Sequence, residues 1–288
     1  MISLAPLSHY DQVTCFSLPG KPEMELTVRR FDKLHPEISG NKWFKLIHWL
    51  KDLPAYEAVV SFGGAYSNHL LALSAAGRET GIRTIGIVRG DIVENPWLQA
   101  MKQNGMEIHF VSRESYRQKT DHGFLQNWTD KLGSCRIVPE GGAGLPGILG
   151  AAEMVQSDEP FDWIVLPGGT GTSAAGIAQK LEKSLSKVLC FQVLKGEQIL
   201  QQELRKHGFD SSYYPNLVFN ADFHFGGYAK SKPELIAFQQ QWIEQTGIPI
   251  DLVYGAKALF GLYALFLEQK LGNKKRIIYI HTGGLGPN

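Results

Sequence analysis

Long apolar runs are missing from this 288-residue sequence, and so is any marked excess of charge. No stretch approaches the ~18 uncharged apolar residues of a membrane-spanning helix, so no membrane segment is expected. The formal net charge is +1, which gives no electrostatic reason to expect nucleic acid or an anionic membrane as a partner. The first ten residues lack a basic stretch followed by an apolar run, so no signal peptide is predicted.

Cysteine is also scarce. The three cysteines, Cys15, Cys135 and Cys190, are odd in number and widely spaced. This pattern predicts neither a disulfide framework nor a metal site, and it favours a reducing compartment, so a cytoplasmic protein is expected. The composition is otherwise that of a globular chain, with 43% hydrophobic and 20% charged residues. Its length allows one large domain or two modest ones.

Short apolar strands alternate with helical segments along the chain. Strands are expected at 25–31, 59–62, 83–88, 106–111, 136–139, 163–167, 187–194 and 276–280. Helices are expected at about 42–50, 67–78, 96–103, 144–155, from 173 onward, and near 197–207, 232–245 and 256–269. This alternation indicates βαβ units and therefore an α/β fold with mostly parallel sheets flanked by helices.

A glycine-rich loop follows the strand expected at 163–167. Glycines directly after an apolar strand let the backbone turn tightly and approach an anion. The following helix adds free N–H groups and the positive end of its dipole. The residues of this loop, Gly168, Gly169, Thr170, Gly171 and Thr172, therefore predict a phosphate site in preference to a plain strand-to-helix turn.

The same loop also matches the loose dinucleotide fingerprint, through Gly169, Gly171 and Ala174. A nicotinamide-binding fold needs an acidic residue at the end of the next strand. This sequence has Lys195 and Gly196 there. An NAD-dependent oxidoreductase is therefore the weaker alternative.

Lys42 stands directly after Gly40 and Asn41, where a helix is expected to begin. The helix dipole favours anions there, so it lowers the pKa of an amine, and burial adds to this effect. A lysine that is neutral more often can form a Schiff base with an aldehyde. A lone lysine is nevertheless more commonly solvated, and Lys45 on the same helix is expected to be the solvated one.

Ser67, Asn68 and His69 open the helix expected at 67–78. Ser67 suits an N-cap and Asn68 a helix start, so ordinary capping explains them as well as function does. In the functional alternative, backbone N–H groups at this helix start hold a carboxylate, and the Ser67 hydroxyl faces the substrate. His69 is more commonly a satisfied helix residue than a catalyst.

Six segments in their order along the chain resemble the pyridoxal-phosphate enzymes of the tryptophan synthase β-like family, fold type II. Within that family the similarity is to the D-cysteine desulfhydrases and the 1-aminocyclopropane-1-carboxylate (ACC) deaminases. The segments are SGNKWFKL at 39–46, SFGGAYSNHLLALSAAG at 61–77, PEGG at 139–142, GGTGTSAAG at 168–176, VYGAK at 253–257 and IHTGG at 280–284. Each segment is common by itself, whereas the ordered set is specific.

The resemblance implies pyridoxal 5'-phosphate as the cofactor and a small amino acid as the substrate. Lys42 would be the Schiff-base lysine and would also move the Cα proton, and Ser67 and Tyr254 match catalytic positions. The other residues implied to bind the cofactor are Asn41, Gly168, Gly169, Thr170, Gly171, Thr172 and Thr282. Those implied to contact the substrate are Ser67, Asn68, His69, Tyr228 and Tyr254.

Two positions bear on the reaction that the resemblance implies. The residue after the tyrosine that Tyr254 matches is a glutamate near the pyridine nitrogen in the deaminases and typically a threonine in the desulfhydrases, whereas Gly255 matches neither. The second position is the variable residue of the His-x-Gly-Gly motif. The deaminases have leucine there and the desulfhydrases threonine, and this sequence has Thr282. Opening a cyclopropane ring needs strong electrophilic activation, which a carboxylate at the pyridine nitrogen helps to supply. Gly255 provides no such carboxylate. β-Elimination of the D-cysteine desulfhydrase type is therefore predicted, with ACC deamination as the alternative.

The resemblance also implies a large domain of residues 1–51 and 159–288, with an inserted small domain of residues 52–158 and the cofactor in the cleft between them. Four short strands are expected within that window. A homodimer is the expectation for the family. Because Gly255 departs from both patterns, a catalytically silent protein that binds the cofactor or an amino acid stays open as a further alternative.

Overall fold

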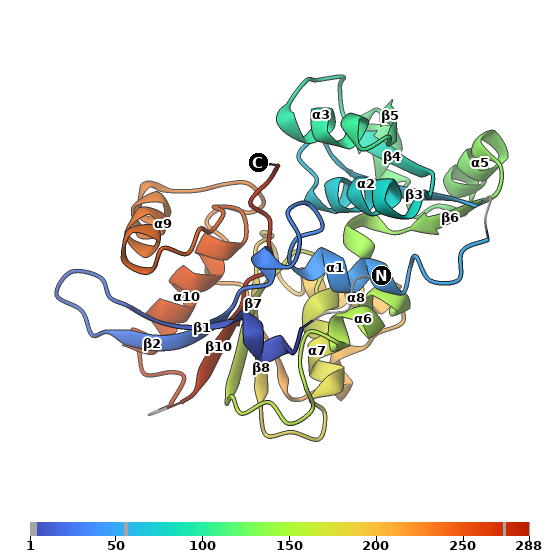
Figure 1. Ribbon diagram of the computed structural model, residues 1–288. Coiled ribbons are helices and arrows are strands. Elements are labelled where there is room, and N and C mark those ends of the chain that lie inside the picture. The colour runs from blue at the N-terminus through green and yellow to red at the C-terminus, as the bar shows by residue number, and fades with distance from the viewer. Residues whose placement is uncertain (1–4, 55–56, 273–274, 288) are drawn as a thin grey trace.

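The strands of the protein form two separate sheets. The structure, a computed structural model, describes residues 5–54, 57–272 and 275–287 (Figure 1). The larger sheet has six strands in the order β1-β2-β10-β7-β8-β9, and the smaller has four in the order β5-β4-β3-β6. Only β1 and β2 run antiparallel, and all other neighbours are parallel. The predicted α/β class with two mostly parallel sheets is confirmed.

The larger sheet consists of β1 (Asp11–Phe16), β2 (Met24–Arg29), β7 (Trp163–Gly168), β8 (Lys187–Gln192), β9 (Leu217–Asn220) and β10 (Ile277–Ile280). The smaller consists of β3 (Ala58–Gly64), β4 (Thr84–Arg89), β5 (Glu107–Val111) and β6 (Cys135–Val138). The helices are α1 (Asn41–Ile47), α2 (Asn68–Thr80), α3 (Pro96–Gln103), α4 (Arg113–Arg117), α5 (His122–Leu132), α6 (Leu145–Ala152), α7 (Thr172–Lys180), α8 (Ile199–Lys206), α9 (Pro233–Thr246) and α10 (Gly255–Leu267). None of the helices in the described ranges is long and apolar enough to cross a membrane.

Both faces of the larger sheet are covered, because its central strands are apolar on both sides. Ile164 and Leu166 of β7 belong to one core, while Val165, between them, belongs to another. Successive side chains of a strand point to opposite faces, so these cores lie on the two sides of the sheet. Helix α10 packs on β7 and β8 from one side and α7 from the other (Figure 1). The continuous apolar runs at 163–167 and 187–194 are the sequence signal for this burial.

Two strands of the larger sheet were not expected from the sequence. Strand β1 pairs with β2 at one edge, and the four-residue β9 pairs with β8 at the other. Edge strands need only one partner and one buried face, so their apolar signal is weak. The first helix was expected over 42–50, whereas α1 ends at Ile47.

The smaller sheet lies wholly within residues 58–138, and its four strands are those expected there. Helix α6 follows it along the chain and packs against α1 and α7. The predicted division into a large domain, 1–51 with 159–288, and a small domain, 52–158, stays a prediction.

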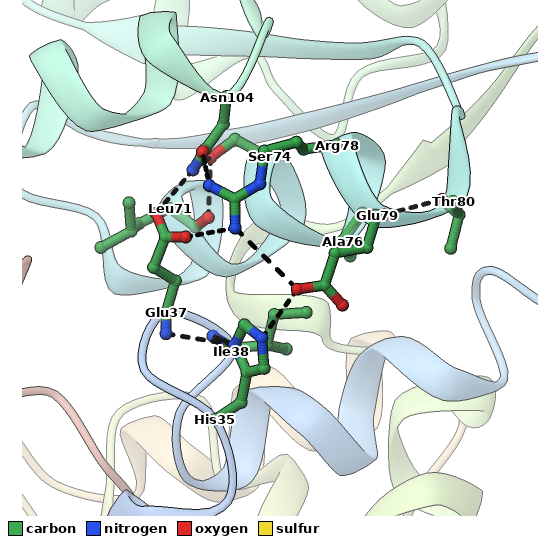
Figure 2. Close-up of polar contacts among 10 residues, drawn as sticks. All are labelled: His35, Glu37, Ile38, Leu71, Ser74, Ala76, Arg78, Glu79, Thr80 and Asn104. Carbon is green, nitrogen blue, oxygen red and sulfur yellow. Dashed lines mark hydrogen bonds and ion pairs between the residues drawn. The ribbon is translucent and has the colours of Figure 1, made fainter. Parts of the chain in front are cut away.

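A polar network joins the loop before α1 to the helices beside the smaller sheet (Figure 2). Arg78 of α2 pairs with Glu37 and bonds Asn104, whose side-chain amide also donates to Glu37 at 2.8 Å. His35 Nε2 lies 2.7 Å from a carboxylate oxygen of Glu79. This network fixes the segment that leads into α1 against α2, the two helices that begin at the candidate site.

Candidate functional site

Lys42 lies in the first turn of α1, at a point where the backbone of two segments meets. Gly40, the N-cap, has a φ of +64°, and a Cβ there would lie 2.0 Å from the carbonyl oxygen of Thr282. Only glycine permits this approach. The Asn41 N–H donates to the same carbonyl at 3.3 Å. The start of α1 is thereby fixed to the segment that follows β10.

Two hydrogen bonds in series hold the Lys42 side chain. Its Nζ donates to Asn41 Oδ1 at 2.7 Å, and Asn41 Nδ2 donates to Ser173 Oγ at 2.9 Å. Ser173 belongs to the first turn of α7, directly after the glycine loop. Asn41 therefore connects the lysine to the predicted phosphate loop.

Burial makes the Lys42 amine easier to deprotonate. It lowers the pKa of Lys42 to about 8, against an opposing effect of the Asp251 carboxylate. The side chain nevertheless keeps part of its surface accessible. An amine with this pKa is neutral in a useful fraction of molecules near neutral pH, as a nucleophile or a base requires.

The glycine loop has the geometry expected of an anion site. Gly171 has a φ of +76° and precedes α7, whose first turn has no side-chain cap. The N–H groups of that turn therefore have no partner within the helix. The hydroxyls of Thr170 and Thr172 lie 2.9 Å apart. Gly168 is the last residue of β7, and a Cβ there would meet Cys190, so its α-carbon faces the core.

Lys45 was expected to be solvated, and this prediction is wrong. Its exposed fraction is 2%, and among the described residues it has neither an ion pair nor a hydrogen bond. A Cβ on Gly141 would lie 4.0 Å from Lys45 Nζ and 3.3 Å from a carbon of Thr170, so the amine is near the loop. Burial, followed by the charge of Lys42, holds the pKa of Lys45 well below its usual range. The spacing of three residues from Lys42, which puts both lysines on one side of the helix, was the missed signal.

Ser67 and Asn68 occupy the start of α2. Ser67 is the N-cap, and its Oγ accepts from the Leu70 N–H at 3.2 Å, as ordinary capping requires. Asn68 Oδ1 accepts from the indole N–H of Trp97 at 2.9 Å. A cavity of about 110 Å³ lies beside Asn68 and is also lined by Asp32, Ser39, Leu71 and Gly284.

His69 is buried and held as one tautomer by its partners. Its Nε2 lies 2.8 Å from Ser61 Oγ, and the Ser61 hydroxyl donates to the Val138 carbonyl at 2.7 Å. The proton must therefore be on Nε2, which leaves Nδ1 as an acceptor. Nδ1 is buried without a partner in the described part of the chain. Burial, with Lys42 and Lys45 nearby, keeps the pKa of His69 well below its usual range, so the ring is neutral.

Tyr254 and Tyr228 form the opposite side of the site. Their rings make an edge-to-face pair with centroids 6.0 Å apart. A Cβ on Gly169 would lie 3.2 Å from the ring of Tyr254, so this tyrosine covers the glycine loop. Burial raises the pKa of Tyr254 well above its usual range, and the phenol keeps its proton.

Asp251, which lies three residues before Tyr254, was not among the site residues predicted from the sequence. Its carboxylate accepts backbone N–H groups of Val253, Tyr254 and Gly255 at 2.7–3.0 Å. An Asp just ahead of an expected helix is a capping signal, which could have drawn attention to it. Across the described ranges no group of three or more His, Cys, Asp or Glu side chains is arranged to hold a metal ion.

A phosphate-bearing aldehyde fits these residues. The half-buried Lys42 and the buried Lys45 lie near a glycine loop and an uncapped helix start, and among the described residues neither forms an ion pair. A buried cation without a counter-ion is costly, and a phosphate would supply the missing negative charge. The amine of Lys42 is the group that could bind the aldehyde.

Comparisons with known proteins agree with this fit. The family described as pyridoxal-phosphate dependent enzyme matches residues 29–283. The chain is 28% identical to the bifunctional D-cysteine desulfhydrase/ACC deaminase of Arabidopsis thaliana, over 94% of this chain and 75% of that protein. It is 27% identical to a putative ACC deaminase of Pyrococcus horikoshii, over 91% of this chain and 85% of that one. The crystal structure of an ACC deaminase homologue superposes with a TM-score of 0.77 and 25% identity, over 91% and 85% of the two chains.

The prediction of a pyridoxal-phosphate cofactor is thus confirmed, and an NAD-dependent oxidoreductase is not supported. The matched range contains Lys42, the glycine loop, Tyr254 and Thr282. From its family match and the fit of these residues, the chain belongs to the pyridoxal-phosphate-dependent enzymes.

Proposed function

We propose that the protein is a lyase that acts on a small amino acid by β-elimination, with D-cysteine converted to pyruvate, sulfide and ammonia. The observation that carries this proposal is the pair of Lys42, half-buried, and Lys45, buried, beside the glycine loop. The substrate class rests on the names of the relatives, which include a D-cysteine desulfhydrase of Serratia proteamaculans.

In this proposal Lys42 holds the cofactor through its aldehyde and later removes the Cα proton of the substrate. Bound pyridoxal phosphate supplies the electron sink for the electrons of the broken Cα–H bond. Asn41 orients the Lys42 amine through the 2.7 Å hydrogen bond. Lys45 would offset the negative charge of the phosphate, and the hydroxyls of Thr170 and Thr172 would donate hydrogen bonds to it. Gly168, Gly169 and Gly171 would allow its close approach, and Thr282 would contribute to cofactor binding.

The substrate side of the site consists of Ser67, Asn68, Tyr228 and Tyr254. The Ser67 hydroxyl already accepts the Leu70 N–H, so its own proton is available to the substrate. Tyr254 keeps its proton because burial raises its pKa, so it can donate to the departing sulfur. Nδ1 of the neutral His69 ring carries no proton and cannot donate to a carboxylate, so we assign the substrate carboxylate to Ser67 and Asn68 instead.

A second candidate function is ACC deamination. Gly255 supplies no carboxylate, but the carboxylate of Asp251 lies next to it, 3.2 Å from the point where a Cβ of residue 255 would be. A carboxylate near the ring would strengthen the electrophilic activation that ring opening needs. The position of Asp251 therefore supports ACC deamination as the second candidate function.

We also infer that the cofactor lies between a large domain, 1–51 with 159–288, and a small domain, 52–158. Supporting this division, α1 begins beside β10 of the larger sheet, whereas α2 follows β3 of the smaller sheet. We further propose a cytoplasmic location, since the three cysteines are free thiols, and a homodimer, which is the expectation for the family. Light scattering after gel filtration tests the dimer.

The test uses the purified protein loaded with pyridoxal phosphate. We expect an absorbance band of the bound cofactor, release of sulfide and pyruvate from D-cysteine, and little 2-oxobutyrate from ACC. Lys42→Ala should abolish both the band and turnover, while Lys206→Ala, on the exposed side of α8, should preserve both. Full activity in Lys42→Ala would refute the assignment. A bound cofactor without turnover across D- and L-amino acids would indicate a silent binding protein.

A further inference from the structure

The carboxylate of Asp251 is rigidly held at the start of α10. Oδ1 accepts the N–H groups of Val253 at 2.8 Å and Tyr254 at 2.7 Å, and Oδ2 accepts that of Gly255 at 3.0 Å. Each carboxylate oxygen has more than one lone-pair direction, so Oδ2 keeps capacity for a second donor.

This carboxylate lies in the protein interior without a cation in contact. No ion pair of Asp251 occurs among the residues that the structure describes. His281 lies nearest to another acid, Asp32, at 3.7 Å, and Lys257 donates to a backbone carbonyl at 2.7 Å. The Asp251 carboxylate raises the pKa of both Lys42 and Lys257 against the lowering effect of burial. Once the Lys42 amine has bound an aldehyde, Asp251 requires another positive partner.

Two glycines pack beside Oδ2. A Cβ on Gly255 would lie 3.2 Å from Oδ2 and 3.4 Å from the hydroxyl of Tyr279. A Cβ on Gly284 would lie 3.5 Å from Oδ2 and 3.5 Å from the side-chain amide nitrogen of Asn68. A larger residue at 284 would crowd the carboxylate on the side of Asn68, and one at 255 would crowd it on the side of Tyr279.

We propose that Asp251, whose carboxylate lies beside Gly255, is the acid that pairs with the ring nitrogen of pyridoxal phosphate. This inference rests on the proposed function, because it takes the cofactor to be held by Lys42 and by the glycine loop. A carboxylate in contact with a pyridine nitrogen stabilises its protonated form, and the protonated ring is the stronger electron acceptor. The pyridinium is in turn the cation that Asp251 lacks.

The experiment measures the protonation state of the ring nitrogen. The protein is loaded with pyridoxal phosphate carrying ¹⁵N in the ring, and its nitrogen resonance is recorded at neutral pH. We expect the pyridinium shift in the wild type and the free-base shift in Asp251→Asn. Asp121→Asn is the matched control, because Asp121 also accepts first-turn N–H groups, at the start of α5, away from the site. It should leave the pyridinium shift unchanged.

A second variant tests the inference even if Asp251→Asn does not fold. Gly255→Ala retains the carboxylate and its backbone partners but adds a methyl group 3.2 Å from Oδ2. We expect it to weaken cofactor binding about tenfold, as for the loss of one charge-assisted hydrogen bond, and to move the resonance toward the free base. A free-base nitrogen in the wild type, or an unchanged pyridinium in both variants, would overturn the inference. Failure of the wild type to bind the cofactor would refute the proposed function instead.

Discussion

The Nε2 of His69 lies 2.8 Å from Ser61 Oγ, and this contact determines what His69 can do. Ser61 gives its own proton to the Val138 carbonyl, so the imidazole proton is on Nε2 and the free Nδ1 is an acceptor. A neutral acceptor repels a carboxylate and attracts a donor. The amines of Lys42 and Lys45 are candidates for that donor, because both lower the pKa of His69.

Ser61→Ala should destabilise the protein through His69. The variant leaves the Nε2–H buried without an acceptor, and we expect unfolding to become easier by about 1–3 kcal/mol. Ser186→Ala is the matched control, since Ser186 also donates to a backbone carbonyl at 2.7 Å but contacts no histidine. Urea unfolding measures both, and equal losses would contradict a special role for the Ser61–His69 pair.

Lys45→Met should weaken cofactor binding and largely spare the chemical step. The buried amine near Thr170 would no longer face the phosphate, and we expect the Kd for pyridoxal phosphate to rise about tenfold or more. At saturating cofactor the rate should return to near the wild-type value. Fluorescence titration of the apoprotein measures the Kd. An unchanged Kd would show that Lys45 does not contact the phosphate.

The reactivity of Lys42 should rise with pH through about 8 in the apoprotein. Burial lowers its pKa to that value, so the neutral, reactive amine becomes the major form above it and the minor form below it. Exposed lysines reach the same point only near pH ~10.4. The rate of covalent labelling at Lys42, followed by mass spectrometry against pH, measures the midpoint. Asp251→Asn should move this midpoint down, because the carboxylate favours the charged amine; a midpoint near 10 in the wild type would contradict the burial argument.

Arg78→Ala should loosen the junction between the loop before α1 and α2 (Figure 2). Its guanidinium bonds both Glu37 and Asn104, but it is 45% exposed, so we expect a loss of only about 1 kcal/mol. Arg83→Ala removes a comparably exposed pair with Glu107 within the smaller sheet. We expect that control to leave the Kd for the cofactor unchanged while Arg78→Ala raises it. Equal Kd values for the two variants would show that this network has no effect on cofactor binding.

Much of the fold was predictable because buried strands leave a plain signal. The runs at 163–167 and 187–194 are apolar on both faces, as helix-covered parallel strands must be, and the structure has β7 and β8 there. The edge strands β1 and β9 were not predicted, because a strand with one hydrogen-bonded neighbour and one buried face needs fewer apolar residues. Whether the domain division at 52–158 holds stays a prediction.

The sequence by itself determined the fold class, the cofactor and the lysine that could hold it. Glycine loops, a helix start and an ordered set of short motifs are local features, and the chain order conveys them. The tertiary structure alone decided the charge environment of the site. Lys45, expected in solvent, is buried beside Thr170, and the carboxylate of Asp251 lies beside Gly255, because burial and proximity depend on how distant segments pack. The effect of having glycine at position 255 therefore depends on the carboxylate of Asp251, which lies beside it.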